Sequence, residues 1–120
     1  MVHANLRMLI PPRERGDVVD FLVSFARRTR FEPGCIGCRV YRDLEQKKGI
    51  LLEELWKDEE HLERHLRTSG FQKVLLVLEL SPAAPEISFE AVTRSTGIET
   101  IEEARCGTKA EGGLESRPPS

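Results

Sequence analysis

Hydrophobic and polar positions in the first third of the chain change from a two-residue period to a helical one. Residues 4–10 (ANLRMLI) alternate well enough to predict a first strand, which Pro11 and Pro12 end. Over residues 13–30 the apolar positions recur at the spacing of one broad helix face, and a Glu-Pro-Gly turn ends this helix at residues 32–34. The apolar positions are Val18, Leu22, Phe25 and Ala26, flanked by Val19, Phe21 and Val23.

The remaining pattern predicts a hairpin of two strands, a helix in two sections and a last strand. The polar turn at residues 44–48 is short enough to make the two hairpin strands neighbours. The helix begins near Asp58, an N-cap residue, and is interrupted around Ser69 and Gly70. The other predicted segments are strands at residues 35–43, 50–56 and 86–93 and a second helical section at residues 71–80.

The order β-α-β-β-α-β predicts an α+β, ferredoxin-like fold, in which a four-stranded antiparallel sheet carries both helices on one face. The third strand is apolar on both sides, with Ile50 and Leu52 facing one way and Leu51 and Leu55 the other. Two helices cover only one face, so we expect the other face to have a partner. The simplest partner is a second copy, which predicts a homodimer burying roughly 1,200–2,000 Å².

Residues 1–95 are predicted to form this domain. Residues 96–106 are predicted to form a C-terminal arm or short helix, because IETIEEAR at 98–105 has weak helical character. The last stretch, residues 107–120, is rich in Gly, Glu, Ser and Pro and is predicted to be disordered.

The composition argues against nucleic-acid binding, membrane insertion and a disulfide-bonded secreted protein. A net charge of −2 over 120 residues gives no electrostatic footprint for nucleic acid or an anionic membrane. The longest apolar run, at residues 74–80, is far too short to cross a bilayer, and the N-terminus lacks a secretory cleavage pattern. Three cysteines do not suggest a disulfide framework. We therefore expect a cytoplasmic protein without nucleic-acid or membrane partners.

The candidate chemistry lies between residues 50 and 71. Strand and helix periodicities bring Glu54, Trp56 and His65 towards one cleft between sheet and helix, beside the inward stripe of Leu62 and Leu66. Glu54 is the most informative of the three, because a carboxylate in an otherwise apolar strand is costly to bury without a partner. From the residues alone, a neighbouring arginine at position 39 or 42 is as plausible a partner as His65.

With these elements placed, the chain resembles the antibiotic biosynthesis monooxygenase (ABM) domain family over about residues 5–92. The matching words are EPGC at 32–35, VYRD at 40–43, ELWKD at 54–58 and HL at 65–66, followed by Phe71. The resemblance implies a dimeric α+β barrel and, in many members, oxygenation of aromatic polyketides or quinols without metal or flavin; other members degrade haem or have no known activity.

The family pattern also implies roles for individual residues. Glu54, Trp56 and His65 stand where relatives line their cleft, and Asn5 and Tyr41 are predicted to contact substrate. Two departures matter. Gly70 stands where many relatives have a second histidine. In haem-degrading relatives an iron-binding histidine lies a few residues past the phenylalanine, but residues 72–75 of this chain contain no histidine, which argues against haem binding.

Oxygenation without a cofactor is possible when a deprotonated hydroxylated aromatic itself supplies electrons to O₂. The protein then has to bind, deprotonate and exclude water, so no cofactor is predicted. His65 is the predicted base because its ordinary pKa of about 6.5 lies near working pH. Trp56 could stack on the ring, and Glu54 could orient the imidazole or accept a proton. In the alternative, structural interpretation, His65 is a hydrogen-bonded residue at the edge of the core and Trp56 is part of the core.

Two other site types are weaker. His61 and His65 lie one helical turn apart, but no third metal ligand is indicated and His61 is predicted to face solvent, so no metal site is predicted. Cys35 and Cys38 have redox-motif spacing, yet positions i and i+3 of a strand face opposite ways, which disfavours a bridge.

The leading hypothesis is a cofactor-independent monooxygenase acting on a small hydroxylated aromatic or quinol. The competing one is a non-catalytic dimeric barrel that binds a small apolar ligand or serves as an interaction module.

Overall fold

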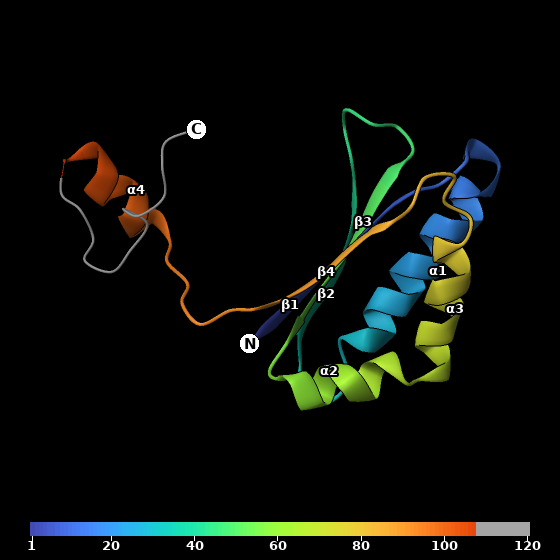
Figure 1. Cartoon of the computed structure of the whole chain (residues 1–120), viewed down its shortest axis with the longest axis horizontal. Helices are drawn as coiled ribbons and strands as arrows, with labels where there is room; N and C mark the ends of the chain where they lie inside the picture. The colour runs from blue at the N-terminus through green and yellow to red at the C-terminus, as the bar shows by residue number, and fades with distance from the viewer. Residues whose placement is uncertain (108–120) are drawn as a thin grey trace.

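The computed structural model describes residues 1–107, which form four strands and four helices (Figure 1). Their order is β-α-β-β-α-α-β-α. The bounds are β1 Val2–Leu9, α1 Pro12–Thr29, β2 Cys35–Arg42, β3 Gly49–Trp56, α2 Glu59–Leu66, α3 Ser69–Leu78, β4 Glu86–Ala91 and α4 Ile98–Arg105. The predicted tail at 107–120 lies, apart from Gly107, outside the described residues.

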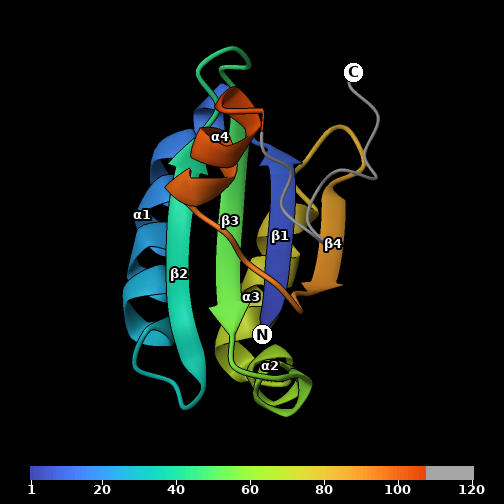
Figure 2. The ribbon, with the colours of Figure 1, turned by 90° about the vertical axis from the view of Figure 1, so that its left-hand side faces the viewer.

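The strands form one antiparallel sheet in the order β2-β3-β1-β4, which confirms the predicted ferredoxin-like fold. Helices α1 and α3 lie side by side on one face, and α2 crosses the end of the sheet where β3 stops (Figures 1 and 2). Within residues 1–107 no helix packs against the opposite face, since α4 stands away from the sheet (Figure 1) although it overlaps β2 and β3 in the view of Figure 2. We call the first the helix face and the second the open face.

The core lies between the sheet and α1 and α3. Alternate residues of β1 and β3 point to the helix face and are buried, as the period of two requires. They meet one apolar stripe of α1 and one of α3, which is the arrangement that removes the most apolar surface from water. The main members are Leu6, Met8, Ile50, Leu52, Leu22, Phe25, Phe71 and Val74.

The predicted interruption of the second helix occurs two residues earlier than expected. Helix α2 ends at Leu66, and Thr68 caps α3 because its side-chain oxygen accepts a hydrogen bond from the backbone N–H of Phe71 at 3.2 Å. Ser69 and Gly70 therefore open α3 instead of breaking it. The turn at Thr68 redirects the chain from the end of the sheet onto the helix face.

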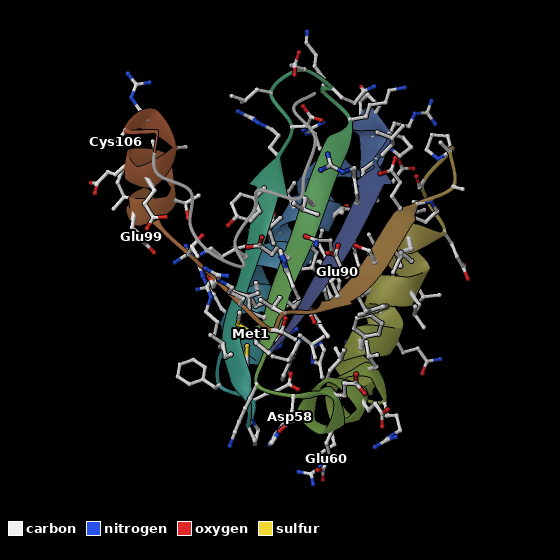
Figure 3. All side chains as sticks on the ribbon, turned by 60° about the vertical axis from the view of Figure 1, so that its left-hand side comes forward. Met1, Asp58, Glu60, Glu90, Glu99 and Cys106 are labelled. Carbon is white, nitrogen blue, oxygen red and sulfur yellow. The ribbon has the colours of Figure 1, made fainter. Side chains whose placement is uncertain are left out.

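The helix α4 projects away from the body, with Glu99 and Cys106 far from the start of α2 at Asp58 (Figures 1 and 3). Its apolar side chains Ile98 and Ile101 are exposed, and none of its residues is buried. None of the helices in the described part of the chain combines the length and the apolar character that a membrane crossing needs.

Candidate functional site

Three pieces of chain converge at the end of the sheet where β3 finishes. Glu54 and Trp56 come from β3 and point to the helix face, and His65 comes from the last turn of α2. Asp58 fixes the start of α2 because its side chain accepts the backbone N–H of His61 at 2.9 Å, which makes it the predicted N-cap. The third piece is the turn between α1 and β2, which contributes Glu32.

These side chains form one hydrogen-bonded chain, which we call the Glu–His–Glu network: Glu32, His65 and Glu54, with Trp56 attached. The Nδ1 of His65 lies 3.0 and 3.1 Å from the carboxylate oxygens of Glu32, and its Nε2 lies 3.1 Å from Oε2 of Glu54. The indole N–H of Trp56 donates to the other oxygen of Glu54 at 2.9 Å. Both oxygens of Glu54 are thereby used, which meets the requirement for burying a carboxylate.

The network is enclosed by aromatic rings. Trp56, Phe25 and Phe71 surround the imidazole of His65 with ring-centroid distances of 4.6, 5.5 and 5.4 Å. Trp56 is 0% exposed and Glu54 and His65 are each 1% exposed, so these three side chains are core residues in this conformation. Only Glu32, with a side chain 31% exposed, connects the network to solvent.

The charge of His65 follows from its two carboxylate partners. Burial by itself would lower the pKa of His65, but the hydrogen bonds and negative charges of Glu54 and Glu32 outweigh it, and the net shift of the pKa is upward. A protonated imidazole has an N–H on each nitrogen, so it donates to both carboxylates at once. With two carboxylates facing one imidazolium, the network then has more acidic groups than basic ones.

A raised pKa of His65 predicts stability that declines as the pH rises. The contribution is fully present below the unfolded-state pKa of about 6.5 and is lost as the pH rises through the higher folded-state value. Between pH 6 and 8.5 we expect the free energy of unfolding to fall, by at most about 1.4 kcal/mol per pH unit from this group. Urea denaturation at a series of pH values measures it.

The matched control is His65→Gln, in which the position can no longer gain a proton. The difference between wild type and variant isolates His65 from other groups that titrate in this range. The scan stops at pH 8.5 because burial raises the pKa of the thiols of Cys35 and Cys38, and these groups add their own pH dependence in alkali. A difference that is constant across the window would contradict a charged His65.

The sequence brought Glu54, Trp56 and His65 together correctly as neighbours, but Asn5 and Tyr41 lie elsewhere. They point to the open face, where the Tyr41 hydroxyl donates to Oε1 of Glu53 at 3.1 Å and His3 Nε2 lies 3.0 Å from Oε2 of Glu53. Asn5 lies opposite Glu53 in the register and lines a hollow of about 360 Å³ on that face. A single substrate-binding cleft therefore does not include all five predicted residues in this conformation.

The partner of Glu54 is settled in favour of His65. Of the two alternatives, Arg39 lies opposite Glu53 in the register and therefore faces the other side of the sheet from Glu54. Arg42 lies opposite Ile50, four residues before Glu54 along β3. Sequence reasoning missed Glu32 as a site residue, although it belongs to the Glu-Pro-Gly turn that ends the first helix. Because Glu32 lies in a turn, outside any helix or strand, no periodicity of the sequence indicates that its side chain faces the interior.

The expectation that Cys35 and Cys38 face opposite ways was wrong. A register shift between Cys35 and Gly37 lets Cys35 pair with Trp56 and Cys38 with Glu54, two positions that share the helix face. The bulge adds one residue, so the two cysteines face the same way. Burial raises the pKa of both thiols, which keeps them protonated and unreactive at neutral pH.

His61 is more constrained than the helical wheel suggested. Its side chain is 22% exposed, and its Nδ1 lies 2.7 Å from Oδ1 of Asp58. Within residues 1–107, no group of three or more His, Cys, Asp or Glu side chains is placed to hold a metal ion.

Comparison with solved structures gives the same fold. A candidate antibiotic biosynthesis monooxygenase of Deinococcus radiodurans is 23% identical with a TM-score of 0.75, covering 82% of this chain and 98% of its own. A conserved protein of Methanosarcina mazei is 27% identical with a TM-score of 0.68, covering 74% and 89%. A Mycobacterium tuberculosis protein is 20% identical with a TM-score of 0.71, covering 80% and 98%.

Sequence comparison identifies the family. An uncharacterised protein of Synechocystis is 26% identical over 73 residues, which are 61% of this chain and 48% of that protein. The chain thus spans about half the length of this curated relative. The family model described as antibiotic biosynthesis monooxygenase matches residues 1–75, a region that includes every member of the Glu–His–Glu network. The chain belongs to the antibiotic biosynthesis monooxygenase family.

Proposed function

We propose that the protein is a cofactor-independent monooxygenase acting on a small hydroxylated aromatic or quinol, with the Glu–His–Glu network as its base. The observation that carries this proposal is the network itself. Two of its three ionisable groups, His65 and Glu54, are buried in an otherwise apolar interior, where well-packed apolar residues would often be as stabilising or more so. Perturbed, desolvated titratable groups of this kind concentrate at functional sites.

Each member of the network has a role in the proposed reaction. A substrate hydroxyl gives its proton to the network through Glu32, the member that reaches solvent. His65 carries the proton between the two carboxylates, and Glu54, held by the Trp56 N–H, fixes the orientation of the imidazole. The structure thus favours His65 as a proton carrier between carboxylates over the free base expected from its ordinary pKa.

The deprotonated aromatic then supplies the electrons. For a naphthol-like substrate, O₂ places one oxygen atom on a ring carbon, the C–H and O–H bonds at the reacting positions are broken, and a quinone forms. The second oxygen atom leaves as water with the two released hydrogens, so atoms and electrons balance without a further reductant. The aromatic rings around His65 keep water away from the imidazole. These rings are buried, so the substrate hydroxyl meets the network at the side chain of Glu32, which is 31% exposed.

Oxygen consumption with reduced naphthoquinols and polyhydroxylated aromatics tests the proposal. We expect uptake above the autoxidation rate in wild type and a loss of about 10²-fold or more in His65→Ala and Glu32→Gln, the size of a general-base contribution. Glu53→Gln is the matched control, because Glu53 is the neighbouring carboxylate on the open face. Uptake that survives in the network variants would contradict the assignment of the base, and uptake that never exceeds autoxidation would favour the second candidate below.

One observation favours a second candidate function, a non-catalytic dimeric barrel. The side chains of His65 and Glu54 are each 0% exposed, as in a structural network that only fixes α2 onto the sheet. In that case the network variants lose stability but change no catalytic rate. An apolar ligand or a partner protein would then use another part of the surface.

We also propose that a second copy covers the open face. This face is more polar than the sequence suggested, and its two edges carry unlike charges: Arg39 lies on β2, whereas Glu86 and Glu90 lie on β4. Between the edges lie Glu53 on β3 and Arg7 on β1, and Arg7 is 4.0 Å from Glu86. A two-fold axis parallel to the strands places β2 over the partner's β4 and brings unlike charges together. An axis perpendicular to the strands would instead place each strand over its own copy, and β4 with Glu86 and Glu90 would face the same acidic strand. Light scattering at micromolar concentration measures the mass, and a monomer would contradict the dimer.

A further inference from the structure

The turn that carries Glu32 packs against His61, a residue that is not part of the Glu–His–Glu network. Gly34 adopts a φ of 81°, a left-handed conformation that favours glycine. A Cβ at Gly34 would overlap the imidazole ring of His61, so that ring lies directly against the Gly34 backbone. The contact is possible only because position 34 has no side chain.

The ring of His61 is itself held in place. Its Nδ1 lies 2.7 Å from Oδ1 of Asp58, and the same oxygen accepts the His61 backbone N–H at 2.9 Å. The negative charge of Asp58 persists to low pH because hydrogen bonds from the backbone and side chain of His61 lower the pKa of Asp58. His61 is thus fixed to the first turn of α2 before it meets the turn at residues 30–35.

A second bond holds the same turn. The backbone N–H of Lys57 donates to the carbonyl oxygen of Gly34 at 2.8 Å, which ties the turn to the end of β3. Between α1 and Gly34, the N–H of Glu32 donates to the carbonyl of Thr29 at 2.9 Å. Glu32 therefore sits on a short segment that is fixed at its α1 end by Thr29 and at its β2 end by Lys57 and His61.

We propose that His61 is a positioning residue: by packing against Gly34, it holds the carboxylate of Glu32 on Nδ1 of His65. His61 and His65 are one helical turn apart on α2, so the same helix carries both the clamp and the group that receives the carboxylate. The inference deepens the proposed function and rests on it for its catalytic meaning. The clamp itself is a matter of geometry and can be tested without turnover.

The test is an NMR titration of the imidazole of His65 in the full chain. The four proteins are wild type, His61→Ala, Glu32→Gln and the double variant. Removing the ring should loosen the turn and lower the pKa of His65 in the same direction as Glu32→Gln, by up to the same amount, because both changes weaken the contact with the same carboxylate. The double variant should show no further decrease, since the two changes act through one contact.

Two further variants separate this role from a general loss of structure. His61→Phe keeps an aromatic ring against Gly34 and should keep the pKa of His65 near the wild-type value, although its bond to Asp58 is gone. Gly34→Ala attacks the contact from the other side and should lower the pKa of His65 as His61→Ala does. A merely structural role for His61 would change the unfolding free energy in these variants without moving the pKa of His65.

Opposite results would overturn the proposal. An unchanged pKa of His65 in His61→Ala, or additive decreases in the double variant, would show that His61 does not act through Glu32. Failure of the proposed function is distinguishable from this. Absent oxygen uptake together with the predicted non-additive titration would leave the clamp standing and remove only its catalytic meaning.

Discussion

Replacing Trp56 with alanine is expected to lower the free energy of unfolding by about 3–5 kcal/mol, the range found for large aromatic residues removed from a core. The indole is 0% exposed, stacks against His65 with ring centroids 4.6 Å apart, and donates its N–H to Glu54. The substitution therefore opens a cavity and leaves a buried carboxylate oxygen without a donor. Urea denaturation followed by circular dichroism measures the change.

Trp56→Phe separates the two components of this loss. It keeps most of the aromatic volume but removes the N–H donor, so we expect a loss of about 1–3 kcal/mol, the cost of one unsatisfied buried polar group. A loss well under 1 kcal/mol for Trp56→Ala would contradict the core position and would indicate an exposed platform for a substrate ring.

Replacing Glu54 with alanine is expected to destabilise the protein by a similar amount, about 3–5 kcal/mol, as when one partner of a buried ion pair is removed. Glu54 lies 3.1 Å from Nε2 of His65, and both side chains are 0% exposed. In the variant, the His65 imidazole keeps its contact with Glu32 but loses the contact with Glu54, and the Trp56 N–H loses its acceptor. Chemical denaturation at pH 7 gives the difference.

The neighbouring residue provides the control. Glu53 has the same charge and lies on the same strand, but it faces the open side and its hydrogen bonds to Tyr41 and His3 are partly exposed. Glu53→Ala should cost under about 1 kcal/mol in the monomer, as for exposed pairs. Equal losses for the two variants would mean that burial does not distinguish the two carboxylates.

Local periodicity accounts for what the sequence predicted at this site. Glu54 and Trp56 are two residues apart on a strand, and His65 lies beside the apolar stripe of a short helix. Both relations follow from the geometry of single elements, which the order of the chain encodes directly. The element order likewise gave the sheet topology, because β-α-β-β-α-β leaves few alternatives.

The features that were missed depend on contacts between elements. Glu32 and His65 are separated by 33 positions, and nothing in the turn itself points that carboxylate inward. The side that Cys35 faces depends on a bulge, which moves it relative to Cys38 by one residue. Asn5 lies on the open face because it alternates with Ala4 and Leu6, whose side chains are buried on the helix face.

Glu32 is the member of the Glu–His–Glu network that lies between the buried interior and solvent. The fold buries His65 and Glu54 completely, and this burial gives the network both its perturbed charge and its stability cost. Glu32 links that interior to solvent, and His61 with Gly34 holds it there.

The most direct test of this account is the charge of His65. The chain has three histidines, so His3 and His61 serve as internal references in the same long-range ¹H–¹⁵N spectrum. At pH 6.5, the ordinary pKa of a histidine, the raised pKa of His65 predicts that the imidazolium pattern, with protons on both ring nitrogens, exceeds the neutral pattern, and we expect this excess to be lost in the double variant Glu32→Gln/Glu54→Gln. A neutral tautomer in wild type, with one protonated and one bare nitrogen, would contradict the charged Glu–His–Glu network.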